Sequence, residues 1–331
     1  MIETLYIERA VFDHPRSKAI RSRFPRARVI ECQRYSEIFN PKAQNFRLQK
    51  GQPSLILAEK FKHFVLETPL SYNIGGQHNY YFSHMLNCIY DCRYCFLQGM
   101  YRSANYVLFV NYEDFDSAIE EVACQADEPA YFFSGYDCDS LALEPVTGFI
   151  KHILPLFRKL DNAWLELRTK STQIRGLLEV EAMTNCIVAF SLSPSVLAEA
   201  LEHKAPPLSN RLDALEKLQR AGWLIGLRFD PILFCDNYQP LYNDFFEQVF
   251  TRIDLQLLHS VSLGVFRLPQ GFYRNMVKLY PEEKLFAGPL TASQSMVSYE
   301  AALEQEMLAF CRTKLLQLMP DNKLFNCYDN D

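Results

Sequence analysis

Residues 80–98 read YYFSHMLNCIYDCRYCFLQ, a stretch that joins a predicted β-strand to three closely spaced cysteines. The strand is expected over Tyr80–Leu86, where β-forming and apolar residues dominate. Cys88, Cys92 and Cys95 follow it directly in a C-x3-C-x2-C pattern. The chain has ten cysteines, and all the others stand alone. This cluster is therefore the first specific indication of chemistry in the sequence.

From about residue 79 onward, apolar runs rich in β-formers alternate with amphipathic helical patterns. The expected strands are Tyr80–Leu86, Ala130–Ser134, Trp164–Arg168, Cys186–Ser191, Leu224–Phe229 and Ser262–Arg267. The expected helices are Tyr112–Ala123, Thr147–Leu160, Ile174–Glu179, Pro207–Ala221, Gln239–Ile253 and Gly271–Lys278. Six strands separated by helices predict parallel β/α units, and six such units form an incomplete, TIM-like (β/α)6 barrel. In such α/β folds the chemistry lies at the carboxyl ends of the strands.

The segments on either side of the barrel predict smaller units. Residues 1–78 are interpreted as an N-terminal α/β extension, with a helix near Pro15–Arg23 and strands near Ala27–Ile30 and Leu55–Leu57. Residues 79–297 form the predicted barrel. Residues 298–331 supply a closing helix, expected over 298–318, and a tail.

Composition excludes several classes of protein. Of the 331 residues 49% are hydrophobic and 22% are charged, which is ordinary for a globular chain. No apolar run of about 18 residues is present, so no membrane span is expected. The first ten residues lack the apolar core of a secretory signal, so the cytoplasm is the expected compartment. In a reducing compartment, cysteines indicate metal binding, catalysis or burial rather than disulfides.

The net charge of −5 gives no overall indication of nucleic-acid binding. A local exception is the segment between Arg9 and Arg34, where eight basic residues occur with only Asp13 and Glu31 as acids. Such a patch can contact phosphates. A solvated helix face explains the same pattern, and we favour that interpretation.

Three thiolates on one tight loop can bind three irons of a 4Fe-4S cubane and leave the fourth iron without a protein ligand. An open iron can chelate S-adenosylmethionine (SAM) and reduce it to a 5′-deoxyadenosyl radical. Structural zinc is the alternative, but it requires four ligands, and only His84 lies near enough in sequence to complete such a set. Three buried free thiols are the remaining alternative.

The cysteine triplet is the signature of the radical SAM superfamily, and the surrounding residues resemble the spore photoproduct lyase family. Cys92–Gln98 (CRYCFLQ) is similar to the cluster loop of that family, which splits a UV-induced thymine–thymine crosslink in DNA. Four further similar stretches follow in order, and the similarity extends from about Tyr6 to about Tyr299. They are Leu143–Thr147, Arg168–Lys170, Phe190–Pro194 and Ala205–Pro207, continued by Arg211–Leu227.

The resemblance implies roles for three residues that bind the cofactor. Lys170 ends the third predicted strand and matches a family lysine that contacts SAM, where a cation suits the SAM carboxylate. Ser191 ends the fourth predicted strand and matches a SAM-contacting serine. Tyr94 lies between two cluster cysteines and matches a tyrosine near SAM and the path of the radical.

Two positions depart from the family pattern. Where the family has a cysteine that returns a hydrogen atom to the product radical, this chain has Tyr136. Where the family has a tyrosine after the third cluster cysteine, this chain has Phe96. Cys138 lies two residues beyond Tyr136, and either a continuing strand or a turn after Gly135 can carry its thiol toward the barrel. We expect Cys138 to be the hydrogen donor, with Tyr136 as the alternative.

The resemblance also implies partners. The chain is expected to act as a carbon–carbon lyase on DNA that carries a thymine photoproduct, with flavodoxin or ferredoxin as the electron donor. Arg267 and Arg274 flank the last predicted barrel strand and, with Tyr273, are candidates for phosphate contacts. The alternative is a radical SAM enzyme of unknown specificity that acts on another nucleoside or a peptide.

Overall fold

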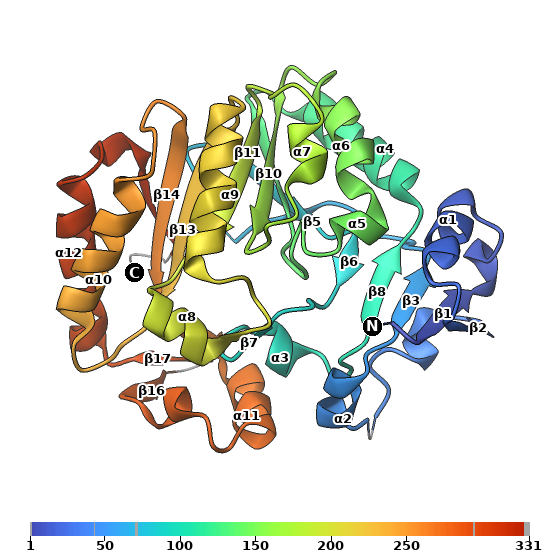
Figure 1. Ribbon diagram of the computed structural model, residues 1–331, viewed down its shortest axis with the longest axis horizontal. Helices are drawn as coiled ribbons and strands as arrows, with labels where there is room; N and C mark the ends of the chain where they lie inside the picture. Colours follow the sequence, from blue (N-terminus) through green and yellow to red (C-terminus); the bar gives the residue numbers. More distant parts are fainter. Residues whose placement is uncertain (1, 43, 70–71, 294, 328–331) are drawn as a thin grey trace.

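The computed structural model describes residues 2–42, 44–69, 72–293 and 295–327. Its largest element is a curled eight-stranded sheet in the order β18-β14-β13-β11-β10-β9-β5-β4 (Figure 1). Six of these strands follow one another along the chain and pair in parallel. They are β5 (His78–Phe82), β9 (Ala130–Ser134), β10 (Ala163–Thr169), β11 (Cys186–Ser191), β13 (Leu224–Ile232) and β14 (Leu258–Val265). The predicted partial (β/α)6 barrel is therefore confirmed.

Short strands flank the two edges of the barrel sheet. β18 (Leu324–Asn326) adds in parallel to β14, and β4 (Leu66–Glu67) pairs antiparallel with β5. Neither strand has a strong sequence pattern, because each contributes only two or three residues. Among the described residues, no helix has the length and apolar character needed to cross a membrane.

Helices cover the outer face of the barrel sheet (Figure 1). They are α4 (Tyr112–Gln125), α6 (Phe149–Phe157), α7 (Arg175–Leu178), α9 (Leu208–Arg220), α10 (Tyr238–Phe250) and α12 (Ala301–Leu316). The expected helix over residues 147–160 begins instead as a separate turn, α5 (Glu144–Thr147), because Gly148 adopts a left-handed conformation before α6. The predicted closing helix corresponds to α12.

Gly222 ends α9 in the way its position predicts. Its φ of 88° lies in the left-handed region, which glycine enters without a steric penalty. The Gly222 N–H donates to the Gln219 carbonyl at 2.8 Å, and the Trp223 N–H donates to the Leu218 carbonyl at 3.1 Å. These bonds satisfy the last carbonyls of the helix and direct the chain into β13.

A second, five-stranded sheet forms beside the barrel in the order β2-β1-β3-β8-β6. β1 (Thr4–Glu8), β2 (Arg28–Cys32) and β3 (Leu55–Ala58) come from the N-terminal segment, together with α1 (Pro15–Arg23) and α2 (Phe46–Gly51). β8 (Tyr106–Phe109) and β6 (Met85–Leu86) come from beyond residue 78. The division of the chain at residues 78 and 297 stays a prediction.

The prediction of one continuous strand over Tyr80–Leu86 is wrong, because the structure divides this run between the two sheets. β5 ends at Phe82 in the barrel, and β6 pairs antiparallel with β8 in the other sheet. At the crossing point the Phe109 N–H donates to the His84 carbonyl at 3.0 Å. The sequence shows one continuous β-like run, because its pattern does not indicate which neighbouring strand supplies the hydrogen bonds.

The predicted bounds of the last barrel strand, Ser262–Arg267, are also wrong. β14 ends at Val265, and β15 (Arg267–Pro269) joins a separate antiparallel sheet with β17 (Met296–Tyr299) and β16 (Leu290–Ser293). The Phe266 N–H donates to the Ile232 carbonyl at 3.1 Å, where the chain changes direction. α11 (Gln270–Leu279) follows β15 and packs against α3 (Leu97–Met100), at the lower edge of Figure 1.

Candidate active site

The loop that carries the three cysteines lies against the barrel through a short β-ladder. Within it β7 (Asp91–Cys92) pairs antiparallel with β12 (Glu202–His203), so that Cys92 lies opposite Glu202. The loop begins at Asn87, whose Nδ2 donates to the carbonyls of Ser103 and Asn105 at 3.0 and 3.1 Å. These contacts fix both the start and the middle of the loop.

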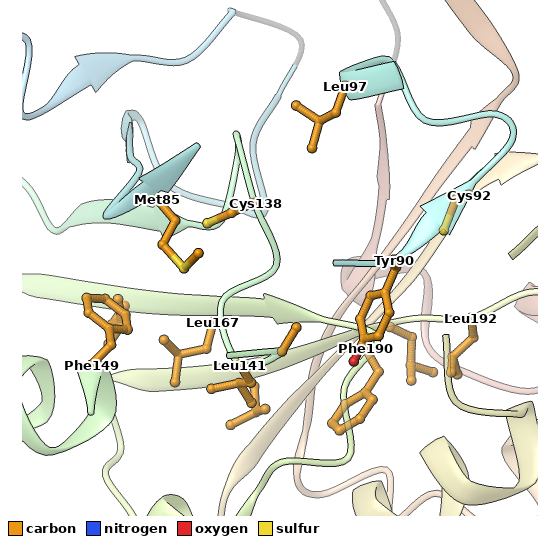
Figure 2. Close-up of a cluster of buried hydrophobic side chains, with 14 of the residues drawn as sticks. Met85, Tyr90, Cys92, Leu97, Cys138, Leu141, Phe149, Leu167, Phe190 and Leu192 are labelled. Atoms are coloured by element: carbon orange, nitrogen blue, oxygen red, sulfur yellow. The ribbon is translucent and has the colours of Figure 1, made fainter. Parts of the chain in front are cut away.

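The three thiols share a buried environment. Cys92 is buried, Cys88 and Cys95 are half-buried, and burial raises the pKa of each thiol, that of Cys92 to about 12. Figure 2 shows Cys92 and Tyr90 on this loop, with Tyr90 directed toward Phe190 of β11. A bound metal must therefore displace a proton from each thiol, which couples metal binding to proton release.

The arrangement fits a cluster better than a single ion. In the part of the chain that the structure describes, no three His, Cys, Asp or Glu side chains are grouped to hold one metal ion. The three thiolates of a cubane lie farther apart than the ligands of a single ion, because each thiolate binds a different iron. The zinc alternative relied on His84, whose ring is buried and stacks on Phe149 at 3.9 Å between ring centroids. Burial lowers the pKa of His84 to about 3.

Asp91 anchors the loop to the N-terminal extension and to α11. Its Oδ1 accepts from Arg93 at 2.8 Å and from Lys50 of α2 at 3.0 Å. The Tyr280 hydroxyl lies 3.4 Å away, and the Arg93 guanidinium lies over the Tyr280 ring at 3.9 Å. Burial alone would raise the pKa of Asp91, but the charges of Lys50 and Arg93 hold it below its ordinary value.

The structure brings two of the predicted cofactor-binding residues together. Lys170 follows β10, and its Nζ lies 5.4 Å from the centroid of the Tyr94 ring. Burial alone would lower the pKa of Lys170, but Cys92 and Glu202 nearby raise it above its ordinary value. Ser191 ends β11, and its carbonyl accepts from Arg211 Nη1 at 3.1 Å. Lys170 and Tyr94 therefore lie at the mouth of the barrel, beside the cysteine loop.

Sequence reasoning missed the carboxylate that connects these residues. Glu202 accepts hydrogen bonds from the Tyr94 hydroxyl, from Arg211 and, at 3.1 Å, from the Ser193 hydroxyl. A lone glutamate after a short helix has no sequence signal of its own. The only indication was its place just before the stretch that begins at Ala205, which resembles the family.

Asp139 is a second carboxylate that the sequence did not indicate. It accepts from the Thr169 hydroxyl and the Lys170 N–H, both at 2.7 Å. It also accepts from the N–H groups of Leu141 and Ala142, at 3.0 and 2.9 Å. Burial raises its pKa in spite of these bonds. Asp139 thereby joins the end of β10 to the segment that follows β9.

The segment after β9 places the two candidate hydrogen donors in different surroundings. It turns at Gly135, whose φ is 88°, so the strand does not continue. Tyr136 is 42% exposed and its ring lies 4.4 Å from that of Tyr81 and 5.5 Å from that of Phe96. Cys138 is only 8% exposed and lies beside Met85 (Figure 2).

The basic residues proposed for phosphate contacts are mostly engaged within the fold. Arg267 donates to the carbonyls of Val265 and Cys327 and lies 3.8 Å from Asp230. The Tyr273 hydroxyl donates to the Phe286 carbonyl at 3.1 Å. Arg274 is exposed on α11 and contacts Gln270 at 3.0 Å.

In the N-terminal basic segment three cations are paired with acids. Arg9 lies 2.7 Å from Glu31, Arg16 lies 2.9 Å from Glu113, and Lys18 lies 3.0 Å from Asp13. The two exposed pairs, Arg9–Glu31 and Lys18–Asp13, fit the expected solvated surface, whereas Arg16 is only 18% exposed and connects the segment to α4.

A partial β/α barrel with a three-cysteine loop at the carboxyl ends of its strands defines a radical SAM enzyme, whose cofactors are a 4Fe-4S cluster and SAM. The family model "Spore photoproduct lyase" matches residues 2–289. The chain therefore belongs to the spore photoproduct lyase family.

Similar proteins of known name agree with this membership. The spore photoproduct lyase of Bacillus subtilis (strain 168) is 22% identical over 292 residues, covering 86% of this chain and 83% of the relative. That of Geobacillus sp. (strain Y412MC61) is 23% identical over 202 residues, covering 60% and 59%.

Among solved structures, a spore photoproduct lyase variant with bound AdoMet and dinucleoside spore photoproduct matches with a TM-score of 0.85 at 18% identity. The match covers 99% of this chain and 98% of that one. A spore photoproduct lyase complexed with dinucleoside spore photoproduct matches with a TM-score of 0.83 at 18% identity and the same coverage. At this level of identity the matches show a shared fold.

Proposed function

We propose that this chain is a radical SAM lyase that repairs the spore photoproduct, a UV-induced thymine dimer lesion in DNA. The observation that carries the proposal is the family match over residues 2–289 together with the three-cysteine loop beside Lys170 at the mouth of the barrel. A relative with the same fold binds AdoMet and a dinucleoside spore photoproduct, which supports this choice of cofactor and substrate.

Each residue at the mouth has a distinct role in the proposal. Cys88, Cys92 and Cys95 hold the cluster, and Lys170 binds the SAM carboxylate through a charge-assisted hydrogen bond. Ser191 contributes a hydroxyl at the end of β11. Bound together, the cluster and SAM supply a 5′-deoxyadenosyl radical. Tyr94 lies between two of the cluster cysteines and orients the site through its ring and hydroxyl.

The return of a hydrogen atom is the step at which this chain differs from its family. We propose that the Cys138 thiol donates the atom, because Cys138 lines a small void together with Asp139 and with Cys88 of the cysteine loop. Its S–H bond breaks as a C–H bond forms on the product, and the thiyl radical left on Cys138 returns to the thiol by taking one electron from the proposed flavodoxin or ferredoxin donor and one proton from solvent. Tyr136 is the alternative donor, since its ring is far more exposed.

The protein also needs an electron donor and a means of holding DNA. We propose flavodoxin or ferredoxin as the donor and the cytoplasm as the compartment. Arg274 is the candidate for a phosphate contact, because it is exposed on α11 beside the cysteine loop. Arg267 is a weaker candidate, since its guanidinium already donates to two carbonyls.

A second candidate function rests on the replaced hydrogen-return residues. The Tyr136 ring packs in tilted geometry against the rings of Tyr81 and Phe96, which forms an aromatic cluster where the resemblance implies a thiol and a phenol. Such a cluster suits stacking on a planar ring. A radical SAM enzyme that acts on another nucleoside or on a peptide is therefore the alternative.

Anaerobic assay of the reconstituted protein distinguishes the two functions. We expect dinucleoside spore photoproduct to be converted to dithymidine in the presence of SAM and dithionite, with the product followed by chromatography. A protein that cleaves SAM but leaves the lesion unchanged contradicts repair and supports the second candidate.

A further inference from the structure

We propose that Glu202 is a positioning residue that couples the cysteine loop to the SAM-binding strand ends of the barrel. The proposal rests on the proposed function only in taking SAM and the cluster as cofactors. Glu202 touches neither cofactor in this proposal. It acts through Tyr94, Arg211 and Ser193.

The contacts of Glu202 come from three separate parts of the chain. The Tyr94 hydroxyl belongs to the cysteine loop, the Ser193 hydroxyl follows β11, and Arg211 lies on α9. The Glu202 backbone adds a fourth connection, because it pairs with Cys92 in the β7–β12 ladder. Glu202 thus holds the backbone of Cys92 through the β-ladder and the side chain of Tyr94 through its carboxylate.

Arg211 extends this connection to Ser191. Its Nη1 donates to the Ser191 carbonyl at 3.1 Å and its Nε donates to the Pro206 carbonyl at 2.7 Å. The side chains of Glu202 and Arg211 are 0% and 1% exposed, so neither charge is screened by water. A shift of the carboxylate therefore moves the guanidinium, and with it the backbone that carries Ser191.

The charges around Glu202 also support this positioning role. Lys170 and Arg211 are cations near Cys92, and Glu202 interacts with both. Removal of the Glu202 charge leaves two cations in a buried space, which displaces one of them. Lys170 is the less constrained of the two, because Arg211 is held by two backbone carbonyls. We therefore infer that Glu202 sets the position of the Lys170 ammonium as well as that of Tyr94.

Glu202→Gln tests the proposal, because it keeps the shape and removes the charge. We expect the anaerobically reconstituted variant to retain about four irons per chain. We expect it to bind SAM about 10-fold more weakly or worse, as for the loss of a charge-assisted contact. The change that SAM causes in the electron paramagnetic resonance spectrum of the reduced cluster should also diminish.

Glu166→Gln is the matched control. Glu166 and Arg228 form a second fully buried ion pair in the same barrel, with Nη2 and Oε2 2.6 Å apart, and Glu166 makes no hydrogen bond to the cysteine loop. We expect this variant to lose thermal stability but to bind SAM within about twofold of wild type, which is below 0.5 kcal/mol. Equal losses of SAM affinity in the two variants would overturn the proposal.

If the Glu202→Gln variant fails to assemble the cluster, Tyr94→Phe tests the same proposal. It removes one hydrogen bond to Glu202 and preserves the ring near Lys170. We expect about threefold weaker SAM binding with iron retained, and little further loss when it is combined with Glu202→Gln. Wild-type SAM affinity in Tyr94→Phe, or in Glu202→Gln, would contradict the proposal. These assays need no lesion, so failure to repair spore photoproduct leaves this result interpretable.

Discussion

The two sides of the barrel mouth, the one formed by the cysteine loop and the one that carries Tyr136, differ in how many buried polar contacts hold them. On the cysteine-loop side Asp91, Glu202 and Arg211 are buried and each contacts two or more other segments. On the other side Tyr136 is half-exposed and is held by contacts between aromatic rings. The first side starts the radical reaction in the proposed function, and the second receives its product.

This difference matches one of the two departures from the family pattern. Of the two residues that the resemblance marks as different, Tyr136 lies on the half-exposed side, whereas Phe96 directly follows the third cysteine of the loop and contacts the Tyr136 ring. A change to Glu202 or Asp91 would leave several buried polar groups without partners, which is costly. In the proposed function, a change at Tyr136 or Phe96 alters the hydrogen-return step or the substrate and leaves the initiating site in place.

The strongest test of the cysteine-loop side removes a cluster ligand. Cys92→Ala should abolish cluster assembly and SAM cleavage, because no other thiol of the loop is free to replace it. Iron and sulfide analysis of the reconstituted protein measures this directly. Cys186→Ala is the control, since Cys186 is buried at the start of β11, far along the strand from the mouth. A Cys92→Ala protein with a full cluster that cleaves SAM would overturn the assignment.

The next test addresses the side of the barrel mouth that carries Tyr136 and Cys138. Cys138→Ala should yield trapped by-products in place of clean thymine repair, because the product radical then lacks the proposed donor thiol. Tyr136→Phe should have the smaller effect, since it removes only a phenolic O–H. Chromatography and mass spectrometry of the products compare the two variants. The opposite ranking would assign the donor role to Tyr136.

A smaller effect is expected from the charge beside Tyr94. Lys170→Ala should weaken SAM binding by about 1–3 kcal/mol, the range for one charge-assisted hydrogen bond. Cluster assembly should persist, because no iron ligand is lost. Calorimetric titration measures the affinity, and Lys151→Ala serves as an exposed-lysine control on α6. Unchanged affinity in Lys170→Ala would place Lys170 outside the SAM site.

The last test measures the stability of the fold rather than SAM binding, and it concerns the segment that carries Tyr136 and Cys138. Glu144 follows this segment, accepts from the Ile150 N–H at 3.2 Å, and has its pKa raised by burial from 4.5 to about 7. The folded state therefore binds the Glu144 proton more tightly than the unfolded state does. Its contribution to stability is greatest below pH 4.5 and is lost as the pH rises to about 7, by about 3 kcal/mol at most.

Glu144→Gln should remove this dependence, because glutamine keeps an acceptor for Ile150 and does not ionise. Chemical unfolding at pH 5 and pH 8 measures the difference for wild type and variant. We expect the wild type to lose more unfolding free energy than the variant between these values. Equal losses would show that burial does not perturb this carboxyl.

Much of the site was predictable because it depends on local patterns. The cysteine spacing needs only one loop, whereas the SAM contacts of Lys170 and Ser191 were implied by the family resemblance and stay a prediction. The buried carboxylates were not predictable in this way. Glu202 is 108 residues from Tyr94, and nothing in either neighbourhood indicates that they meet. Arg267 was assigned to a surface role, because its contact with Cys327 spans 60 residues.

The sequence by itself determined the alternation of strands and helices, the order of the barrel and the three-cysteine loop. Periodicity determines which face of an element is buried, and spacing within a loop determines which thiols lie together. Only the tertiary structure decided where the run Tyr80–Leu86 divides between two sheets and which carboxylate neutralises Lys170 and Arg211. Those outcomes depend on strand pairing and on contacts between distant segments, which no local pattern specifies.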